Sequence, residues 1–199
     1  MHNLVNQLSM SVTLLQKNLF FVSILIGLLF AIHIVNWMVG YRLNYFGIWP
    51  RKLLSLPGIF ISPFLHGDFN HVFFNSIPLF IMVSFVLLNG MAVFICVSFI
   101  IIILGGLATW LIGRPGVHIG ASGVIMGYWS YLMVEAYKHP TVVSVALAVV
   151  CVYYFGGLVL NLFPTKIKSS WEAHFFGFLA GLAAVYATPI ILAMGKTVV

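Results

Sequence analysis

Long apolar runs recur along the whole sequence and are separated only by short polar connections. Each run has about the twenty residues that a helix needs to cross a hydrocarbon core of roughly 30 Å. Charged residues make up 6% of the 199 residues, against roughly a quarter in ordinary soluble domains, so the chain lacks the polar surface that a water-soluble globule requires. The sequence therefore predicts an all-α membrane protein.

Six candidate transmembrane helices follow from these runs. They span residues 18–39, 69–88, 91–112, 120–135, 141–162 and 171–193. No polar stretch is long enough for a soluble domain, so residues 1–199 are expected to form a single polytopic membrane domain with its core at about 18–194. The formal charge of +6 is spread thinly over the loops, which favours membrane lipids and excludes nucleic acid as the partner.

Two segments depart from a simple helix bundle. The connection 40–68 is too apolar for a solvated linker and too interrupted by Pro and Gly for a span, so it is expected to lie in the membrane interface, with Tyr45 and Trp49 at the headgroup level. The fourth span, 120–135, is shorter than a membrane crossing usually requires. A short helix can begin below the membrane surface where the preceding backbone lines a water-filled cavity, and chemistry is expected there.

A serine flanked by small residues opens this short span. The sequence GASG at positions 120–123 allows a sharp backbone turn and leaves the hydroxyl of Ser122 uncrowded, as a nucleophile needs. Small residues also serve simply to let membrane helices approach one another. The motif alone does not decide between these roles.

His174 lies near the start of the sixth span and is the candidate general base. An ionisable residue inside a span is costly and indicates a functional site. Gly177 and Gly181 follow at one-turn intervals on the same face, and they would let this helix pack closely against Gly123 and Gly127 of the fourth span. Such packing would bring imidazole and hydroxyl within hydrogen-bonding reach. The alternative is a structural histidine bonded to a backbone carbonyl.

His71 and Asn75 open the second span with the spacing i, i+4, which places both side chains on one helix face. Both can donate hydrogen bonds, and an oxyanion requires such donors. The alternative is a polar helix start with Asp68 as its N-cap, which leaves Asn75 unexplained.

The remaining polar or small residues within the apolar runs are expected to be structural. They are His33 and His66 as satisfied histidines, Cys96 and Cys151 as core residues, and the pairs 105–106 and 156–157 as glycine packing notches. His118 is near enough in sequence to Gly120 to line the cavity mouth, but no role is assigned to it.

The acidic residues do not complete a catalytic triad. Only Asp68, Glu135 and Glu172 occur, and Glu172 is two positions before His174, which points it to a different helix face. Paired aspartates within spans and a His-Glu pair at metalloprotease spacing are both absent from the sequence. A serine–histidine dyad with no metal and no cofactor is therefore expected.

Taken in order, these motifs resemble the rhomboid intramembrane serine proteases. The pattern HxxxN lies at the start of the second span, GxSG at the start of the fourth, and AHxxGxxxG in the sixth. The resemblance covers about residues 69–193. It implies six transmembrane helices, with a short central fourth helix and a membrane-embedded first loop.

The resemblance also implies a function and a site. Ser122 and His174 would form the catalytic dyad, and the oxyanion hole would consist of His71, Asn75 and the Ser122 backbone N–H. The substrates would be transmembrane proteins, with no cofactor. The family's usual orientation, with the N-terminus cytoplasmic in a bacterial cell membrane, is opposite to the count of Lys and Arg in the loops, and we follow the family.

Three positions depart from the family pattern. The first loop carries LPGI at 56–59 instead of a Trp-Arg pair, and the second span ends at 85–89 without an acidic residue. Met126 stands where an aromatic residue often packs on the base. Two other functions stay open: an inactive rhomboid-like protein that binds transmembrane clients, and a small transporter or channel, for which an internal repeat would be expected but is not found.

Overall fold

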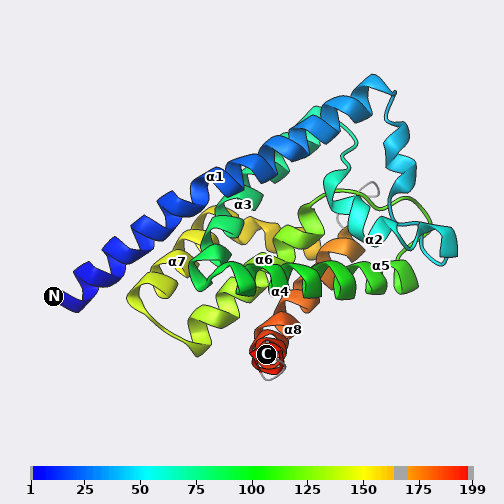
Figure 1. The fold of residues 1–199 in the computed structure, drawn as a ribbon. Helices are drawn as coiled ribbons and strands as arrows, with labels where there is room; N and C mark the ends of the chain where they lie inside the picture. Colours follow the sequence, from blue (N-terminus) through cyan, green and yellow to red (C-terminus); the bar gives the residue numbers. More distant parts are fainter. Residues whose placement is uncertain (1, 164–169, 197–199) are drawn as a thin grey trace.

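The computed structural model describes residues 2–163 and 170–196 and places them in a bundle of helices (Figure 1). The α-helices are α1 (His2–Met38), α2 (Gly58–Ile61), α3 (Phe69–Val86), α4 (Met91–Ile100), α5 (Gly106–Ile112), α6 (Ser122–Lys138), α7 (Val142–Phe155) and α8 (Trp171–Lys196). A π-helical turn, η5 (Ile101–Gly105), joins α4 to α5 without a break. The prediction of an all-α membrane protein is confirmed.

Among the residues that the structure describes, four helices are long and apolar enough to cross a membrane. They are Val5–Met38, Phe69–Asn89, Met91–Ile112 and Trp171–Gly195, which correspond to the first, second, third and sixth predicted spans. Helix α6 has 17 residues and α7 has 14, so both are shorter than a typical span. The short fourth helix is thus present, while the count of six spans stays a prediction.

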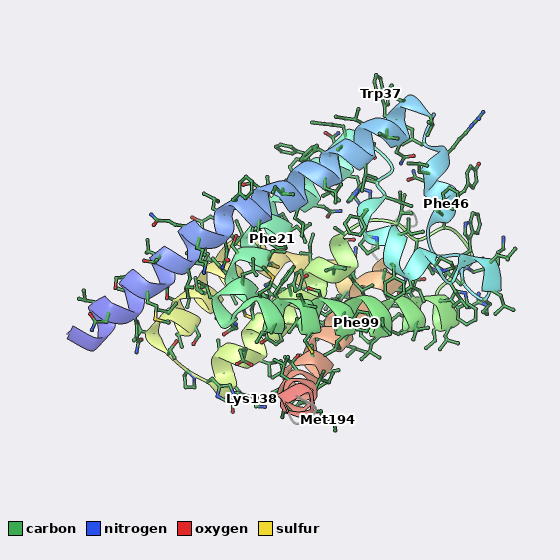
Figure 2. All side chains as sticks on the ribbon, in the orientation of Figure 1. Phe21, Trp37, Phe46, Phe99, Lys138 and Met194 are labelled. Carbon is green, nitrogen blue, oxygen red and sulfur yellow. The ribbon has the colours of Figure 1, made fainter. Side chains whose placement is uncertain are left out.

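The outer surface of the bundle is apolar, as a surface in contact with lipid requires. Side chains such as Trp37 and Phe46 project from it, with 64% and 60% of their surface exposed (Figure 2). In the connection after α1, Leu54 is 99% exposed. This connection folds into short helical turns, of which Leu53–Phe64 is apolar, and its place in the membrane interface stays a prediction.

Two helix boundaries differ from those expected. Helix α1 begins at His2 rather than near residue 18, because residues 2–17 contain no Gly or Pro that would break it. The fifth apolar run is α-helical only to Phe155 and continues as the 3-10 helix η6 (Gly156–Leu162), which starts at a pair of glycines. Most of the predicted loop between the fifth and sixth spans, 163–170, lies outside the described residues.

Helix α6 lies at the centre of the bundle and packs closely on α8 (Figure 1). Glycines make this approach possible. A Cβ atom on Gly177 would overlap the carbonyl oxygen of Gly123, and one on Gly181 would overlap the carbonyl oxygen of Gly127. The hydroxyl of Ser130 on α6 also donates to the carbonyl of Phe178 on α8 at 2.8 Å. The predicted glycine contact between the fourth and sixth spans is therefore present.

The first connection is fastened to the loop that precedes α6. Backbone bonds join Ile48 and His118 in both directions, at 3.0 and 2.8 Å, and the N–H of Gly120 donates to the carbonyl of Ser62 at 2.9 Å. The guanidinium of Arg51 donates to the carbonyls of Leu111 and Gly113 at the end of α5. Arg51 thus anchors the first connection in a chain that lacks the usual Trp-Arg pair.

Candidate functional site

Ser122 is the first residue of α6 and follows a turn that only glycine adopts easily. Gly120 has a φ of +114°, which L side chains rarely adopt. A Cβ atom there would also lie 2.9 Å from Nε2 of His71. The turn therefore brings the start of α6 directly against α3, so the Ser122 hydroxyl faces the side chains of that helix.

The side chains of Ser122 and His174 are in hydrogen-bonding contact. Oγ of Ser122 lies 2.7 Å from Nε2 of His174, although the two residues are 52 positions apart in the chain. His174 is 8% exposed, and Ser122 is half-buried. With Nε2 unprotonated, the imidazole accepts the hydroxyl proton, which is the arrangement that a general base and its nucleophile require.

This pair opens into a cavity of about 180 Å³ between α3, α6 and α8. Its wall is formed by His71, Phe74, Asn75, Pro78, Ser122, Ile125, Met126 and His174. The volume is several times that of a water molecule, and both polar and apolar atoms line it. The cavity thus has room for several water molecules beside the serine.

His71 and Asn75 both face this cavity from one side of α3. The N-terminus of α3 is capped by Asp68, whose side chain accepts a hydrogen bond from the backbone N–H of His71 at 2.8 Å, so the predicted N-cap is present. The cap fixes the first turn and therefore the direction of both side chains. Both residues share the cavity wall with Ser122 and His174, while the catalytic roles of all four residues stay predictions.

His66 is the site residue that the sequence analysis missed. It is fully buried, and its Nε2 lies 3.1 Å from Nδ2 of Asn75 and 3.4 Å from the backbone nitrogen of Ala121. Both of these neighbours are donors, so Nε2 must act as an acceptor and the ring proton belongs on Nδ1. Burial, with the nearby His71 adding to the effect, lowers the pKa of His66 to about 3, which keeps the ring neutral.

One sequence signal would have identified His66. It precedes Asp68, the residue that caps α3, by two positions. A side chain just before an N-cap can fold back onto the first turns of the helix, where His71 and, one turn later, Asn75 lie. The rings of His66 and His71 indeed meet edge to face with centroids 4.9 Å apart.

The loop before α6 is also tied to the first turn of α8. The guanidinium of Arg114 forms a two-point ion pair with Glu172, through Nε to Oε1 and Nη2 to Oε2. The ring of His118 bonds the hydroxyl of Ser170 at 2.9 Å and the carbonyl of Arg114 at 3.0 Å. These bonds connect the segments that carry Ser122 and His174.

Several predicted positions can now be placed. Glu172 faces Arg114, in agreement with the expectation that it does not complete a triad. His118 is 5% exposed and is not among the residues that line the cavity. The glycines at 105–106 contact α8 and Ile59 as predicted, whereas a Cβ at Gly157 would meet no atom within 4 Å, so the notch predicted at 156–157 is wrong.

Met126 lies in the cavity wall at the position where the family often has an aromatic residue. It is 1% exposed, so it fills its place fully. Within residues 2–163 and 170–196, no three His, Cys, Asp or Glu side chains lie together as a metal site would need.

Comparisons with known proteins agree with this architecture. The family model of the Rhomboid domain matches residues 54–189, which is more than half of the chain. Uncharacterized protein Rv1337 of Mycobacterium tuberculosis is 34% identical over 170 residues, covering 81% of this chain and 71% of that protein. An uncharacterized protein of Mycobacterium leprae is 31% identical over 169 residues, covering 80% and 67%.

Fold and site together define a helical integral membrane protein with a serine and a histidine paired in a cavity inside the bundle. The matches identify the group within that class. The chain belongs to the rhomboid family, whose members are usually intramembrane proteases.

Proposed function

We propose that this protein is a serine endopeptidase that cuts other membrane proteins within or beside their transmembrane segments. The observation that carries the proposal is the 2.7 Å contact between Oγ of Ser122 and Nε2 of His174, at the wall of a cavity with room for several water molecules. A packing role for Ser122 explains neither the contact nor the cavity. A transporter or channel has no need to place a hydroxyl against an imidazole.

The first half of the reaction forms an acyl-enzyme. Nε2 of His174 accepts the hydroxyl proton of Ser122 while Oγ bonds to the carbonyl carbon of the scissile peptide. The carbonyl π electrons move to oxygen and give a tetrahedral oxyanion. The protonated His174 then donates its proton to the leaving nitrogen, and the C–N bond breaks.

Donors on α3 and at the start of α6 stabilise the oxyanion. Asn75, His71 and Ser122 all line the cavity, and Asn75 donates one Nδ2 hydrogen to Nε2 of His66, which leaves its second hydrogen available for the oxyanion. In the second half, a water molecule from the cavity attacks the acyl carbon while His174 accepts its proton. The products are a new carboxylate and the free serine.

The environment of the site sets the substrate class. The cavity lies within a bundle whose outer surface is apolar, so substrates reach it from the bilayer as transmembrane or juxtamembrane segments. Relatives from mycobacteria favour a bacterial cell membrane as the location, with membrane lipids as the surrounding solvent. No cofactor enters this mechanism.

The test is cleavage of a reporter transmembrane peptide by purified protein, together with labelling by a fluorophosphonate. Wild type is expected to be labelled and to cut the peptide, whereas Ser122→Ala loses labelling and at least about a thousandfold in rate. The matched control is Ser84→Ala on α3, where the hydroxyl bonds only the Phe80 carbonyl, and this variant should keep both activities. Equal cleavage by Ser122→Ala and wild type would refute the proposal.

One observation favours a second function, an inactive protein that holds transmembrane clients. Met126 replaces the aromatic residue that often packs on the base, and methionine fixes a ring less firmly than an aromatic side chain does. Under this alternative, wild type fails to react with the fluorophosphonate but still binds the reporter peptide. The same experiment therefore separates the two functions.

A further inference from the structure

A proline interrupts the hydrogen bonds of α3 beside the candidate site. Pro78 lies inside α3 and is buried, one turn after Phe74. Proline has no backbone N–H, so the carbonyl of Phe74 lacks the donor that residue i+4 normally supplies. This leaves a strong acceptor in the middle of an otherwise regular helix.

The two residues on either side of this acceptor line the cavity. In an α-helix the carbonyl of residue i points toward residue i+4, so the Phe74 oxygen lies between Phe74 and Pro78, and both residues line the cavity with Ser122 and His174. A carbonyl without a donor is costly in hydrocarbon but is tolerated where it lines a water-filled cavity. The position of the proline and that of the cavity therefore fit together.

We propose that the Phe74 carbonyl oxygen is a backbone-binding site for the substrate, accepting a hydrogen bond from a peptide N–H near the scissile bond. The inference rests on the proposed proteolytic function. A substrate in helical form has its N–H groups occupied by its own carbonyls, whereas an extended segment presents them freely. Phe74 and Pro78 share the cavity with the dyad, so an acceptor between them favours segments that have unwound.

The chain offers a matched control for this idea. Pro189 also lies inside a long helix, α8, but it is exposed and takes no part in the cavity wall. Replacing either proline by alanine restores a helical N–H and removes the same ring. Only Pro78→Ala gives the Phe74 carbonyl an internal partner and withdraws it from a substrate.

The experiment measures peptide binding in the Ser122→Ala background, where no turnover occurs. A fluorescent transmembrane peptide in detergent micelles is titrated with each protein, and its anisotropy gives the affinity. Pro78→Ala is expected to weaken binding about 5- to 10-fold, the loss of one ordinary hydrogen bond, while Pro189→Ala changes nothing. Both replacements should raise the temperature of unfolding, because each restores a helical hydrogen bond.

A second arm changes the peptide rather than the protein. Each backbone amide near the cleavage site is replaced in turn by an ester, which removes one N–H and keeps the shape. At one position the ester is expected to weaken binding by a similar factor when Pro78 is present, and to have no further effect in Pro78→Ala. An amide at which the ester substitution and Pro78→Ala cause the same, non-additive loss of affinity would be the one that donates to the Phe74 carbonyl.

The outcomes are distinct from those that test proteolysis. If no ester position weakens binding to the protein that retains Pro78, the inference is overturned, even should Pro78→Ala fold poorly. Unchanged affinity in well-folded Pro78→Ala overturns it as well. If wild type cuts nothing, but Pro78→Ala and one ester peptide both show the expected losses in affinity, the protease is refuted and the Phe74 acceptor still stands.

Discussion

Helices α6 and α7 are neighbours in the chain but are held in the bundle very differently. Helix α6 buries eight of its 17 residues, among them Ile125, Tyr128 and Tyr131, and it lies against α8 over its length. All 14 residues of α7 are described, and only Cys151 is buried. The valine and tyrosine side chains of α7, such as Val149 and Tyr153, are 61% and 80% exposed.

The contrast follows from how helices associate in lipid. Apolar side chains gain little by leaving lipid for another helix, so association depends on close packing and interhelical hydrogen bonds. Glycines and Ser130 provide both between α6 and α8, whereas α7 presents β-branched side chains. The candidate dyad thus lies where two helices pack most closely, and α7 is expected to open more readily.

The largest effect is expected from a methyl group in the tight interface. Gly177→Ala forces a Cβ against the carbonyl of Gly123, so α6 and α8 must separate and the bond between Ser122 and His174 is lost. We expect at least about 3 kcal/mol of destabilisation and no fluorophosphonate labelling, measured by thermal unfolding and by gel. Gly157→Ala, where the added Cβ meets no atom within 4 Å, is the control. Equal effects of the two substitutions would show that α6 and α8 do not depend on their close contact.

A smaller effect is expected where the loop is tied to α8. Glu172→Gln keeps the shape of the side chain but removes the charge that pairs with Arg114, so the loop and His174 are held less firmly. Labelling of Ser122 should slow roughly tenfold, since small displacements of reacting groups are costly. Adding Arg114→Gln should cause little further loss if the pair acts as a unit. Glu135→Gln at the other end of α6 should label at the wild-type rate.

The pH dependence of stability tests how His66 joins α3 to the start of α6. Burial lowers the pKa of His66 from 6.5 to about 3. Between these two pH values His66 is therefore protonated in the unfolded chain but neutral in the folded chain. His66 should therefore leave stability unchanged above pH 6.5 and reduce it as pH falls toward 3, by at most about 1.4 kcal/mol per pH unit. Unfolding in detergent measures this slope, which should be shallower in His66→Gln and unchanged in the exposed His139→Gln.

The smallest effect is expected on the loosely held helix. Val149→Ala removes methyl groups that face outward, so unfolding should change by less than about 0.5 kcal/mol and labelling of Ser122 not at all. Hydrogen exchange in detergent compares the two helices directly, because the amides of α7 should exchange before those of α6. Equal protection of the two helices would show that α7 is held as firmly as α6.

Much of the fold was predictable because it depends on local properties of the chain. Apolar runs identified the helices, and the Asp68 cap and the short fourth helix were visible in the sequence. The boundaries that failed were those without a clear breaker, as at the start of α1, or with a glycine pair that changes helix type, as at Gly156. Such boundaries differ little in energy between the alternatives.

The sequence by itself determined that lipid surrounds this chain, which apolar runs form its helices, and which serine and histidine are candidates for chemistry, because composition and short motifs act over a few turns. Tertiary structure alone decided that His66 orients Asn75, that Glu172 pairs with Arg114, and that Pro78 faces the cavity. The first two contacts join residues 9 and 58 positions apart. Which side chains meet in this way depends on the rotation and depth of each packed helix, and these are set only when all the helices pack together.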